Sequence, residues 1–246
     1  EKQMFYCFGC GEGGNGFDFL MKASHMTFPE AVRHLAAKTG VVIPEPVRSA
    51  TEKAQDGLRE QAVRVNGLAA THFARSLHAA AGRAARAYLE KRGIGAETVK
   101  EFRLGYAPDA WRSLQDRLAR SGAPLDLAEK LGLIIPGKDG GFYDRFRARV
   151  IFPIEDTAGR VVAFGGRIIG EGEPKYLNSP ESLLFSKGRQ LYGLNRAREQ
   201  IRRQDGVILV EGYFDLIALY QAGIRNGVAT LGTALTRDHV DLLRRY

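Results

Sequence analysis

The sequence predicts an α+β fold that continues into a parallel α/β layer at its carboxyl end. Apolar residues recur at helical spacing over 58–92, which indicates a long helical segment. Over 133–169 the pattern changes to a period of two, which is typical of strands. From Gly206 the order is strand, helix, strand, helix, as in a parallel layer. The 246 residues, 44% of them hydrophobic, suffice for one large domain or two ordinary ones.

The first 45 residues are predicted to form a small unit of their own. Thr27 and Glu30 have the spacing of a capping box, so a helix is expected to begin there and to end near Gly40. The other elements expected in this unit are a strand over 4–8, a flexible loop over 13–16 and a helix that begins over 15–21.

A linker is expected between this unit and the main body. Residues 44–57 contain two prolines and several charges without periodicity, which favours an irregular connection. After the long helical segment, short helices are expected over 96–103, 111–120 and 124–131. Strands are then expected over 133–135, 141–143, 149–154 and 161–165, with 156–159 as the hairpin connection of the last two. The carboxyl-terminal elements are a helix over 188–204, a strand over 207–210, a helix, a strand over 227–231 and a helix over 236–245.

Two cysteines, Cys7 and Cys10, lie in a turn rich in glycine. Such a turn places both sulfurs on one side and lets backbone N–H groups approach them, as in a zinc knuckle. Structural zinc takes four ligands and the sequence has no other cysteine, so two further ligands are expected upstream of Glu1. The alternatives are a redox pair or two inert thiols, but the glycines after Cys10 favour the metal. Two cysteines exclude a disulfide framework and fit a reducing compartment.

The net charge of +8 favours a polyanionic partner. Arg145, Arg147 and Arg149 alternate along a strand-like run and are expected to share one face. A phosphate track would satisfy them, and the alternative is a salt-bridged strand. An irregular loop over 175–181 and the segment 185–189 mix cations with aromatic residues, which suits single-stranded nucleic acid or nucleotides. No apolar run approaches the length of a membrane span, so no membrane partner is expected.

The segment 207–215 carries the strongest chemical signal. Residues 207–210 are apolar and are expected to form a buried strand that ends at Glu211. Asp215 follows in the first turn of the next helix, where the helix dipole favours an acid. Ligands bind beyond the carboxyl ends of strands in open α/β sheets, so both carboxylates are expected at one crevice. Such a pair suits a divalent cation and phosphate chemistry.

Several motifs stand in an order that is found in one known family. They are Cys7–Gly11 with Asn15–Leu20, then Tyr88–Ile94, Asp144–Arg147, Phe152–Ile154, Phe164–Arg167, Pro174–Glu181 and Lys187–Gly193, and finally Val210–Asp215 and Ala229–Ala234. The first group resembles the second half of the zinc-ribbon domain of bacterial replicative DNA primases of the DnaG type. The middle group resembles signatures of the RNA polymerase core of that family. The last two resemble the first two motifs of the Toprim fold, a metal-binding module shared with topoisomerases.

The resemblance covers nearly the whole chain and implies a domain plan. It comprises a partial zinc ribbon with helices, a mixed α/β catalytic-core subdomain and the start of a parallel α/β Toprim fold. The expected boundaries are 1–45 for the zinc-binding domain, 46–60 for the linker, 61–204 for the amino-terminal subdomain of the core and 205–246 for the Toprim part.

The resemblance also implies roles for individual residues. Cys7 and Cys10 would be two of four ligands for Zn²⁺. Glu211 would assist proton transfer at a site for Mg²⁺ or Mn²⁺, with Asp215 in support and further ligands beyond Tyr246. The resemblance and the basic segments together predict these residues as binding nucleic acid or nucleotide: Arg92, Arg145, Arg147, Arg167, Lys175, Lys187 and Arg189.

The implied activity is synthesis of short RNA primers from ribonucleoside triphosphates on a single-stranded DNA template in the cytoplasm. The implied partners are the template, the nascent RNA primer, the triphosphates and the replicative helicase, the last through a carboxyl-terminal domain. The family carries an Asp-x-Asp pair on a strand expected beyond Tyr246, so this chain alone is expected to be inactive or nearly so. The alternatives are another Toprim enzyme, such as a topoisomerase or nuclease, and a non-catalytic DNA-binding protein with zinc and Toprim modules. The segments at 174–193 favour primase, and the long core argues against the non-catalytic protein.

Overall fold

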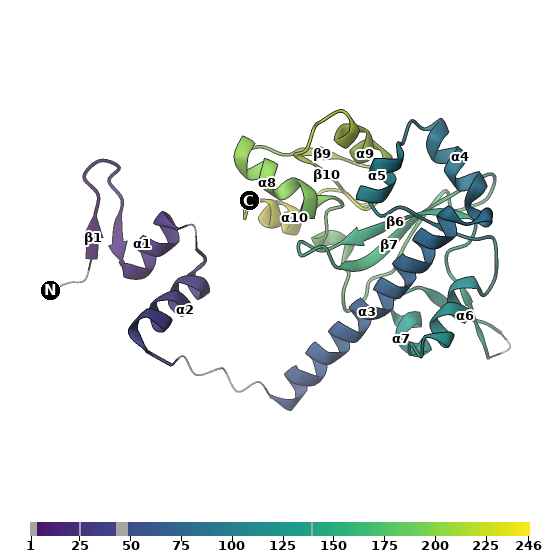
Figure 1. The fold of residues 1–246 in the computed structure, drawn as a ribbon, viewed down its shortest axis with the longest axis horizontal. Helices are drawn as coiled ribbons and strands as arrows, with labels where there is room; N and C mark the ends of the chain where they lie inside the picture. Colours follow the sequence, from purple (N-terminus) through teal and green to yellow (C-terminus); the bar gives the residue numbers. More distant parts are fainter. Residues whose placement is uncertain (1–3, 25, 43–48, 139) are drawn as a thin grey trace. The chain divides into compact units, whose positions relative to one another are not determined.

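The computed structural model describes residues 4–24, 26–42, 49–138 and 140–246. The chain divides into two compact units, Glu1–Lys53 and Ala54–Tyr246, and each is described by itself (Figure 1). Within the described residues, no helix combines the length and the apolar character that a membrane span requires.

The small unit consists of a hairpin and two helices. Strands β1 (Met4–Tyr6) and β2 (Gly13–Asn15) pair antiparallel, and helices α1 (Gly16–Ala23) and α2 (Phe28–Thr39) follow. The prediction of a flexible loop over 13–16 is therefore wrong. Gly14 has a φ of 155°, and a Cβ at this position would lie 2.5 Å from the Asp18 carboxylate. The strand therefore requires glycine here, a residue that sequence patterns associate with loops.

Both helices of the small unit are capped, and the caps of α2 are the predicted ones. The Asn15 side chain accepts hydrogen bonds from the N–H groups of Phe17 and Asp18, at 2.8 and 3.1 Å. Glu30 accepts from the Thr27 N–H at 2.7 Å, which is the predicted capping-box contact. Gly40 ends α2 in the left-handed conformation, with a φ of 68°. The predicted limits of α2 are thus confirmed.

The large unit begins with α3 (Ala50–His78), a helix of 29 residues. The linker prediction is wrong from residue 50 onward, while residues 43–48 lie outside the described residues. Ser49 caps the helix, because its Oγ accepts from the Glu52 N–H at 3.1 Å and Glu52 accepts from the Ser49 N–H at 2.8 Å. The first turns of α3 are exposed and the first buried residue is Ala62, so no apolar periodicity announces the start of the helix.

An antiparallel sheet forms the centre of the large unit. Its order is β3 (Gly105–Ala107), β6 (Arg149–Glu155), β7 (Val161–Ile168) and β8 (Tyr176–Asn178). The predicted hairpin of 149–154 and 161–165 is confirmed, with β7 three residues longer than expected. The prediction of an irregular loop over 175–181 is wrong at β8, whose Asn178 is the register partner of Gly165. A second hairpin, β4 (Ile134–Pro136) with β5 (Phe142–Asp144), lies outside this sheet.

Helices cover both faces of the sheet. Residues of α3, α6 (Ser113–Arg120) and α7 (Leu125–Lys130) share one buried cluster with Ile151 and Phe164. The other cluster joins Val150, Phe152 and Ile154 to residues of α4 (Arg83–Lys91), α5 (Ala96–Glu101) and α9 (Tyr213–Gln221). Alternate residues of β6 therefore face opposite cores, as the period of two predicted. In Figure 1, α4, α5 and α9 lie on one side of β6 and β7, with α6 and α7 on the other.

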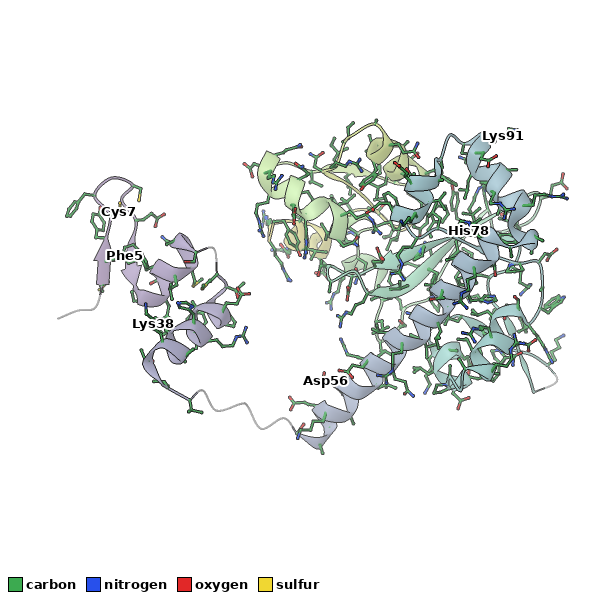
Figure 2. All side chains as sticks on the ribbon, in the orientation of Figure 1. Phe5, Cys7, Lys38, Asp56, His78 and Lys91 are labelled. Atoms are coloured by element: carbon green, nitrogen blue, oxygen red, sulfur yellow. The ribbon has the colours of Figure 1, made fainter. Side chains whose placement is uncertain are left out.

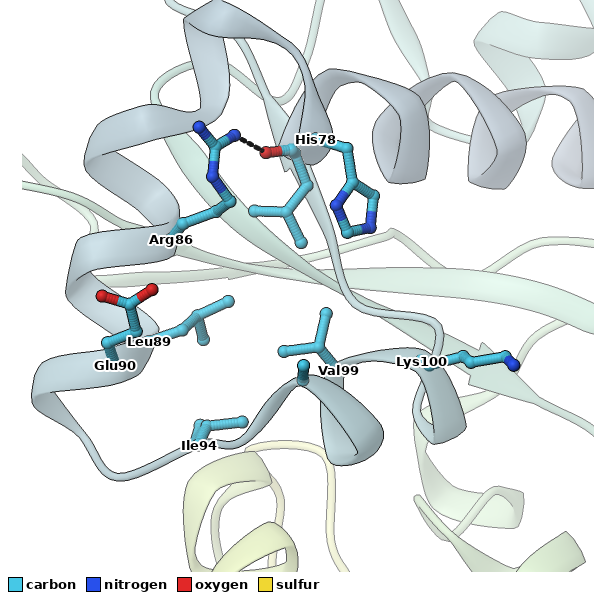
Figure 3. A pocket seen from close by; sticks show the side chains of 9 residues that line it. His78, Arg86, Leu89, Glu90, Ile94, Val99 and Lys100 are labelled. Atoms are coloured by element: carbon cyan, nitrogen blue, oxygen red, sulfur yellow. Dashed lines mark hydrogen bonds between the residues drawn. The ribbon is translucent and has the colours of Figure 1, made fainter.

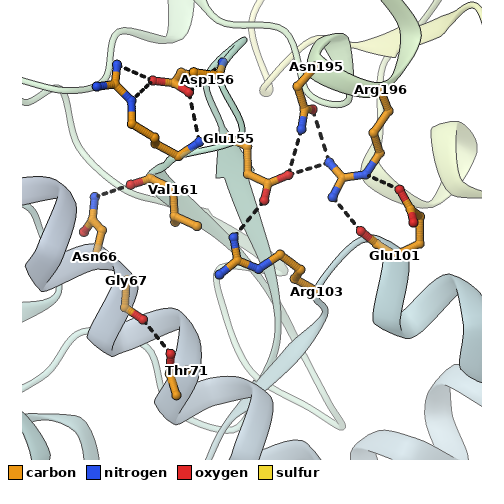
Figure 4. Close-up of polar contacts among 12 residues, drawn as sticks. Asn66, Gly67, Thr71, Glu101, Arg103, Glu155, Asp156, Val161, Asn195 and Arg196 are labelled. Atoms are coloured by element: carbon orange, nitrogen blue, oxygen red, sulfur yellow. Dashed lines mark hydrogen bonds and ion pairs between the residues drawn. The ribbon is translucent and has the colours of Figure 1, made fainter.

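A buried carboxylate joins the sheet to two helices. The Glu155 side chain, only 4% exposed, pairs with Arg103 at 3.0 Å and with Arg196 of α8 (Leu194–Gln204). Arg196 also bonds Glu101 in α5, and Asn195 donates to Glu155 at 3.0 Å (Figure 4). Because both oxygens of Glu155 are satisfied, removal of one partner would leave a charge unpaired in the interior.

The last part of the unit is a parallel pair, as predicted. Strand β9 (Ile208–Val210) pairs with β10 (Gly227–Ala229), and α9 and α10 (Arg237–Leu243) follow them. Tyr192 bridges to Ala229 on the other side of β10. The prediction that residues 207–210 are buried is wrong, because Val207, Ile208 and Leu209 are 37–39% exposed. Strand β10 lies between β9 and Tyr192, so β10 is buried and β9 is an edge strand in the part of the chain described.

Gly165 allows the parallel layer to pack against the antiparallel sheet. A Cβ at residue 165 would lie 2.3 Å from the Tyr213 hydroxyl and 2.4 Å from its ring carbon Cζ. The Tyr213 ring is buried and stacked on Phe152, with ring centroids 4.6 Å apart, and it has no room to withdraw.

Gly165→Ala is therefore expected to destabilise the protein by about 1–3 kcal/mol, the usual range for overpacking. Urea denaturation of the protein that carries this chain measures the change. Gly57→Ala is the matched control, since a Cβ there meets nothing within 4 Å on an exposed helix; it should be neutral or slightly stabilising. Equal stability of Gly165→Ala and the natural protein would contradict the close packing.

Asp144 caps α6 from a distance in sequence. Its carboxylate accepts from the N–H groups of Leu114 and Gln115, at 2.7 and 2.8 Å. Burial nevertheless dominates and raises the pKa of Asp144 to about 6. The folded state thus keeps the proton to a higher pH than the unfolded chain, and stability is lost as the pH rises toward 6.

Asp144→Asn removes this titration. Between pH 4 and pH 7, the free energy of unfolding of the natural protein should fall relative to that of the variant by up to roughly 3 kcal/mol. Denaturation at several pH values measures the difference. A difference that does not change with pH would show that the pKa of Asp144 is the same in both states.

Candidate catalytic and nucleic-acid site

A crevice opens at the carboxyl ends of β9 and β10. The two strands are parallel, so the residues that follow them meet at one edge of the sheet. The crevice has a volume of about 680 Å³, and its lining is Leu209, Val210, Glu211, Thr230, Gly232, Thr233, Ala234 and Leu235. Glu211 is exposed, and within the described ranges no ion pair or side-chain hydrogen bond involves it. Its carboxylate is thus available at the edge where the sequence predicted it.

Asp215 lies in the first turn of α9, as predicted, but it does not line the crevice of Glu211, so the prediction of one crevice for both carboxylates is wrong. One of its carboxylate oxygens would be only 2.7 Å from a Cβ at Gly212, so the missing side chain lets the carboxylate fold back over the start of the helix. Asp215 and Arg92 line a common hollow of about 290 Å³ together with Phe214. The structure therefore brings together the second predicted acid and one predicted cation.

Arg92 and Arg167 belong to a cluster of cations and aromatic rings, which we call the cation–aromatic cluster (Tyr88, Arg92, Arg167, Tyr176 and Phe214). The Arg92 guanidinium lies 4.4 Å from the Phe214 ring centroid and 4.9 Å from that of Tyr88. Arg167 donates to the Tyr88 hydroxyl at 3.1 Å and lies 5.0 Å from the Tyr176 ring. Stacking fixes both guanidinium planes without neutralising them, so their charge stays available to an anion.

The aromatic partner Tyr176 reports on this electrostatic environment. Burial raises the pKa of the Tyr176 hydroxyl, while the nearby Arg167 and Arg92 oppose the rise. Both cations thus act on the same side chain, although one comes from the end of α4 and the other from β7.

The prediction that Arg145, Arg147 and Arg149 share a strand face is wrong. Only Arg149 lies in a strand, and Ala148 before it has a φ of 50°, which breaks the alternation. Arg149 is 5% exposed, and its only contact among the described hydrogen bonds is a long one, 3.4 Å to the Gly166 carbonyl. The Nε of Arg145 is buried without a partner in the described part of the chain. Burial lowers the pKa of both guanidinium groups.

Arg147 takes part in a surface that the sequence did not suggest. Its guanidinium lies 4.2 Å from the Trp111 ring and 5.4 Å from the Tyr143 ring, and it donates to the Asp144 carbonyl. Trp111 is 65% exposed and meets Tyr143 edge to face, with centroids 5.5 Å apart. We call this surface the Trp111 platform (Trp111, Tyr143 and Arg147). An isolated Trp before a short helix gave no signal, because the platform forms only when the β4–β5 hairpin and Arg147 are brought beside it.

The predicted lysines carry free head groups on fixed backbone. Lys175 is exposed, with its carbonyl accepting from the Ile168 N–H at 3.2 Å. Lys187 lies in the short helix η2 (Lys187–Arg189), and its N–H donates to Glu181 at 2.9 Å. Neither ammonium has an ion pair among the described residues. Arg189 differs, since it pairs with Asp238 at 2.8 Å on the exposed surface.

The cysteine turn has the chemistry of half a zinc site. Cys7 and Cys10 are exposed on the turn after β1, where Figure 2 marks Cys7. The N–H of Cys10, its thiol and the N–H of Gly9 bond the Cys7 sulfur, which lowers the pKa of Cys7, whereas the Cys7 thiol raises the pKa of Cys10. The two sulfurs thus lie together with backbone donors around them, as metal-bound thiolates require. No group of three or more potential metal ligands occurs within the described residues, so the pair is a partial ligand set.

A separate apolar hollow of about 310 Å³ lies between α3, α4 and α5. Leu77, Leu89, Ile94 and Val99 line it, with His78, Arg86, Glu90 and Lys100 at its rim (Figure 3). Arg86 donates to the Leu77 carbonyl and closes one side. None of the predicted site residues lines this hollow, and we assign it no role in the site.

Comparison with known families agrees with this geometry. The family described as the DNA primase catalytic core, amino-terminal domain, matches residues 72–198, a zinc finger of the CHC2 type matches 1–51, and a Toprim domain matches 205–246. The CHC2 family implies zinc and the Toprim family a divalent metal. The thiols of Cys7 and Cys10 fit a zinc ion, and the carboxylate of Glu211 fits a divalent metal.

Similar proteins cover the whole chain. A DNA primase from Halalkalibacterium halodurans is 46% identical over 247 residues, which is all of this chain and 41% of that protein. The zinc-binding and RNA polymerase domains of the Aquifex aeolicus primase have a TM-score of 0.72 at 37% identity, and the match covers 100% of this chain and 58% of that one. A DnaG primase catalytic domain bound to ssDNA has a TM-score of 0.71 at 42% identity, with 77% of this chain and 61% of that chain covered.

The chain spans about two fifths of the length of the first of these relatives. The catalytic-core family alone matches more than half of the chain, and the zinc and Toprim matches flank it in the order that the sequence motifs suggested. The mixed fold with a parallel pair at its carboxyl end is also that of the solved primase cores. The chain therefore belongs to the DnaG-type DNA primase family.

Proposed function

We propose that the protein to which this chain belongs synthesises short RNA primers from ribonucleoside triphosphates on a single-stranded DNA template. The observation that carries the proposal is the unpaired, exposed carboxylate of Glu211 in a crevice beyond two parallel strands. Asp215 and Arg92 share a second hollow. An acid and fixed cations are what phosphoryl transfer needs, because the acid takes a proton and the cations hold phosphate oxygens.

In the proposed reaction, the 3′-hydroxyl of the growing RNA attacks the α-phosphorus of the incoming triphosphate. The new O–P bond forms as the bond to the leaving pyrophosphate breaks, and the Glu211 carboxylate accepts the hydroxyl proton. A bound Mg²⁺ or Mn²⁺ supplies charge neutralisation at the transferred phosphoryl group. Glu211, supported by Asp215, would hold it together with the Asp-x-Asp acids that the family resemblance implies.

The cations would orient phosphates and not read sequence. Arg92 and Arg167 are held by the rings of the cation–aromatic cluster, and the free ammonium groups of Lys175 and Lys187 add mobile charges. We assign the phosphates of the template strand, the nascent primer and the triphosphate to these four cations. The proposal of phosphate binding is weaker for Arg189 than the sequence suggested, because Arg189 already pairs with Asp238.

The Trp111 platform would hold the template. An exposed indole beside a stacked guanidinium offers a base a flat surface and its phosphate a charge, which suits single strands of any sequence. A similar primase domain has been solved bound to ssDNA, which supports single-strand binding by this protein. The half-buried Arg145 and the buried Arg149 would add positive potential behind it.

The small unit would bind Zn²⁺ through Cys7 and Cys10 with two further ligands, and would grip the template. A replicative helicase is proposed as a partner of the whole protein. Nothing in the comparisons favours a topoisomerase, a nuclease or a non-catalytic DNA-binding protein.

Glu211→Gln in the full-length protein should abolish primer synthesis and leave the dissociation constant for single-stranded DNA within twofold. The amide keeps the shape of the side chain but accepts no proton. A primer-synthesis assay and fluorescence anisotropy measure the two effects. Glu129→Gln, at an exposed position on α7, is the matched control and should retain activity. Normal synthesis by Glu211→Gln would remove Glu211 from the reaction.

Trp111→Ala and Lys175→Ala should weaken single-strand binding in distinguishable ways. Loss of stacking should cost about 1–3 kcal/mol at every salt concentration, because a base contact releases no counterion. In Lys175→Ala, the loss of one phosphate contact should make the fall of log K with log salt concentration less steep, with a slope smaller by about 0.7. Anisotropy with a labelled oligonucleotide at several salt concentrations measures both. An unchanged slope for Lys175→Ala would place Lys175 on solvated surface, and unchanged affinity for Trp111→Ala would remove the platform from the template path.

A further inference from the structure

The amino end of α10 holds the loop that carries Lys187. His239 is fully buried, with 0% exposure, and its Nε2 lies 2.9 Å from the Lys187 carbonyl oxygen. Its Nδ1 lies 3.2 Å from the Thr236 backbone nitrogen. A carbonyl only accepts and a backbone N–H only donates, so Nε2 carries the hydrogen and Nδ1 is bare. Both nitrogens of the imidazole are therefore used in hydrogen bonds.

Thr236 makes a second contact to the same loop. Its hydroxyl donates to the Gly188 carbonyl at 2.6 Å and accepts from the His239 N–H at 3.1 Å. We call these two residues with their bonds to residues 187 and 188 the Thr236–His239 latch. The exposed pair of Arg189 with Asp238 lies beside it and adds little, since ion pairs in water contribute about 0–1 kcal/mol.

The latch fixes the backbone of Lys187 and leaves its side chain free. The Lys187 N–H donates to Glu181 at 2.9 Å, so the residue is held on both sides of its Cα. The next carbonyl is held as well. The ammonium has no ion pair in the described part of the chain. A lysine whose backbone is held and whose ammonium is unpaired is prepared for an anionic ligand. The free-energy cost of ordering its backbone is met when the protein folds and not when the ligand binds.

The latch also connects this cation to the catalytic crevice. Leu235, the residue before Thr236, lines the crevice that contains Glu211. The wall of the crevice and the loop of Lys187 are thus held at one point, although η2 and Thr236 are nearly fifty residues apart in sequence.

We propose that His239 is a positioning residue for Lys187, and that the Thr236–His239 latch sets where the Lys187 ammonium meets a triphosphate at the Glu211 crevice. The inference rests on the proposed function, since it takes Lys187 to bind phosphate.

Two variants of His239 in the full-length protein separate the contacts. Gln places its amide nitrogen near the position of Nε2 and keeps a donor for the Lys187 carbonyl. Asn places its oxygen near Nδ1, so it keeps the acceptor for Thr236 but loses the bond to the loop. His239→Asn should reduce kcat/KM for ATP by roughly 10- to 100-fold, the effect of a misplacement of about 1 Å. His239→Gln should restore most of this loss, with both variants unfolding at similar urea concentrations.

A double-variant comparison and hydrogen exchange complete the test. His239→Asn combined with Lys187→Ala should be no slower than Lys187→Ala alone, because the latch acts through that ammonium. Amide exchange over 185–190 should rise in His239→Asn and not in His239→Gln, a readout that does not depend on catalysis. Equal losses in the Asn and Gln variants, or multiplying losses in the double variant, would overturn the proposal. Absence of primer synthesis by the natural protein would overturn the proposed function instead, and the exchange result would still report on the latch.

Discussion

The hydrogen bond between Tyr213 and Asn178 is the contact on which the arrangement of the site depends. The Tyr213 hydroxyl donates to the Asn178 Oδ1 at 2.7 Å, and the Asn178 amide donates to the Leu231 carbonyl at 2.8 Å. Burial raises the pKa of Tyr213 well above its ordinary value, so the hydroxyl stays a donor throughout the physiological range. Strand β8, helix α9 and the segment after β10 meet at this bond. Each of them carries or adjoins a site residue: Lys175, Asp215 and the wall of the Glu211 crevice.

Around this bond the charges are divided in a way that suits phosphate chemistry. The structural acids Glu155 and Asp144 are buried and satisfied by arginines or backbone N–H groups. Glu211 is left unpaired at an open edge. The cations Arg92 and Arg167 are stacked on rings and Lys187 is held by its backbone, and no ion pair among the described residues neutralises them. The acids that stabilise the fold are thus buried, while the carboxylates that we propose for the reaction are exposed.

Much of the fold could be predicted from local chemistry. The capping box of α2, the hairpin of β6 and β7 and the parallel pair at the carboxyl end follow from short-range patterns that the structure confirms. The failures have identifiable causes. Strand β2 depends on Gly14 with a positive φ, and the start of α3 is polar and exposed, so neither shows the usual signal. Strand β9 was expected to be buried, but only β10 is flanked on both sides.

The site was predictable where one motif carries both position and chemistry. Glu211 and Asp215 stand at the end of β9 and the start of α9 as their motif suggested, although they line two separate hollows and not one crevice. Arg92 shares the hollow of Asp215, and it belongs with Arg167 to the cation–aromatic cluster. The Trp111 platform, Asn178 and His239 were missed, because each acts through a partner that lies more than thirty residues away in sequence. The prediction that Arg145, Arg147 and Arg149 share a strand face was wrong for a local reason. Ala148 has a left-handed backbone conformation, which turns the chain before β6 begins.

Hydrogen exchange of the Tyr213→Phe variant tests the central contact most directly. The variant removes only the hydroxyl and leaves the Asn178 oxygen buried without its donor, which costs about 1–3 kcal/mol. If this bond joins the two layers, amide protection should fall together in three separate segments: 176–178, 213–221 and 229–233. A loss of protection confined to α9, with β8 and the segment after β10 unchanged, would contradict the account.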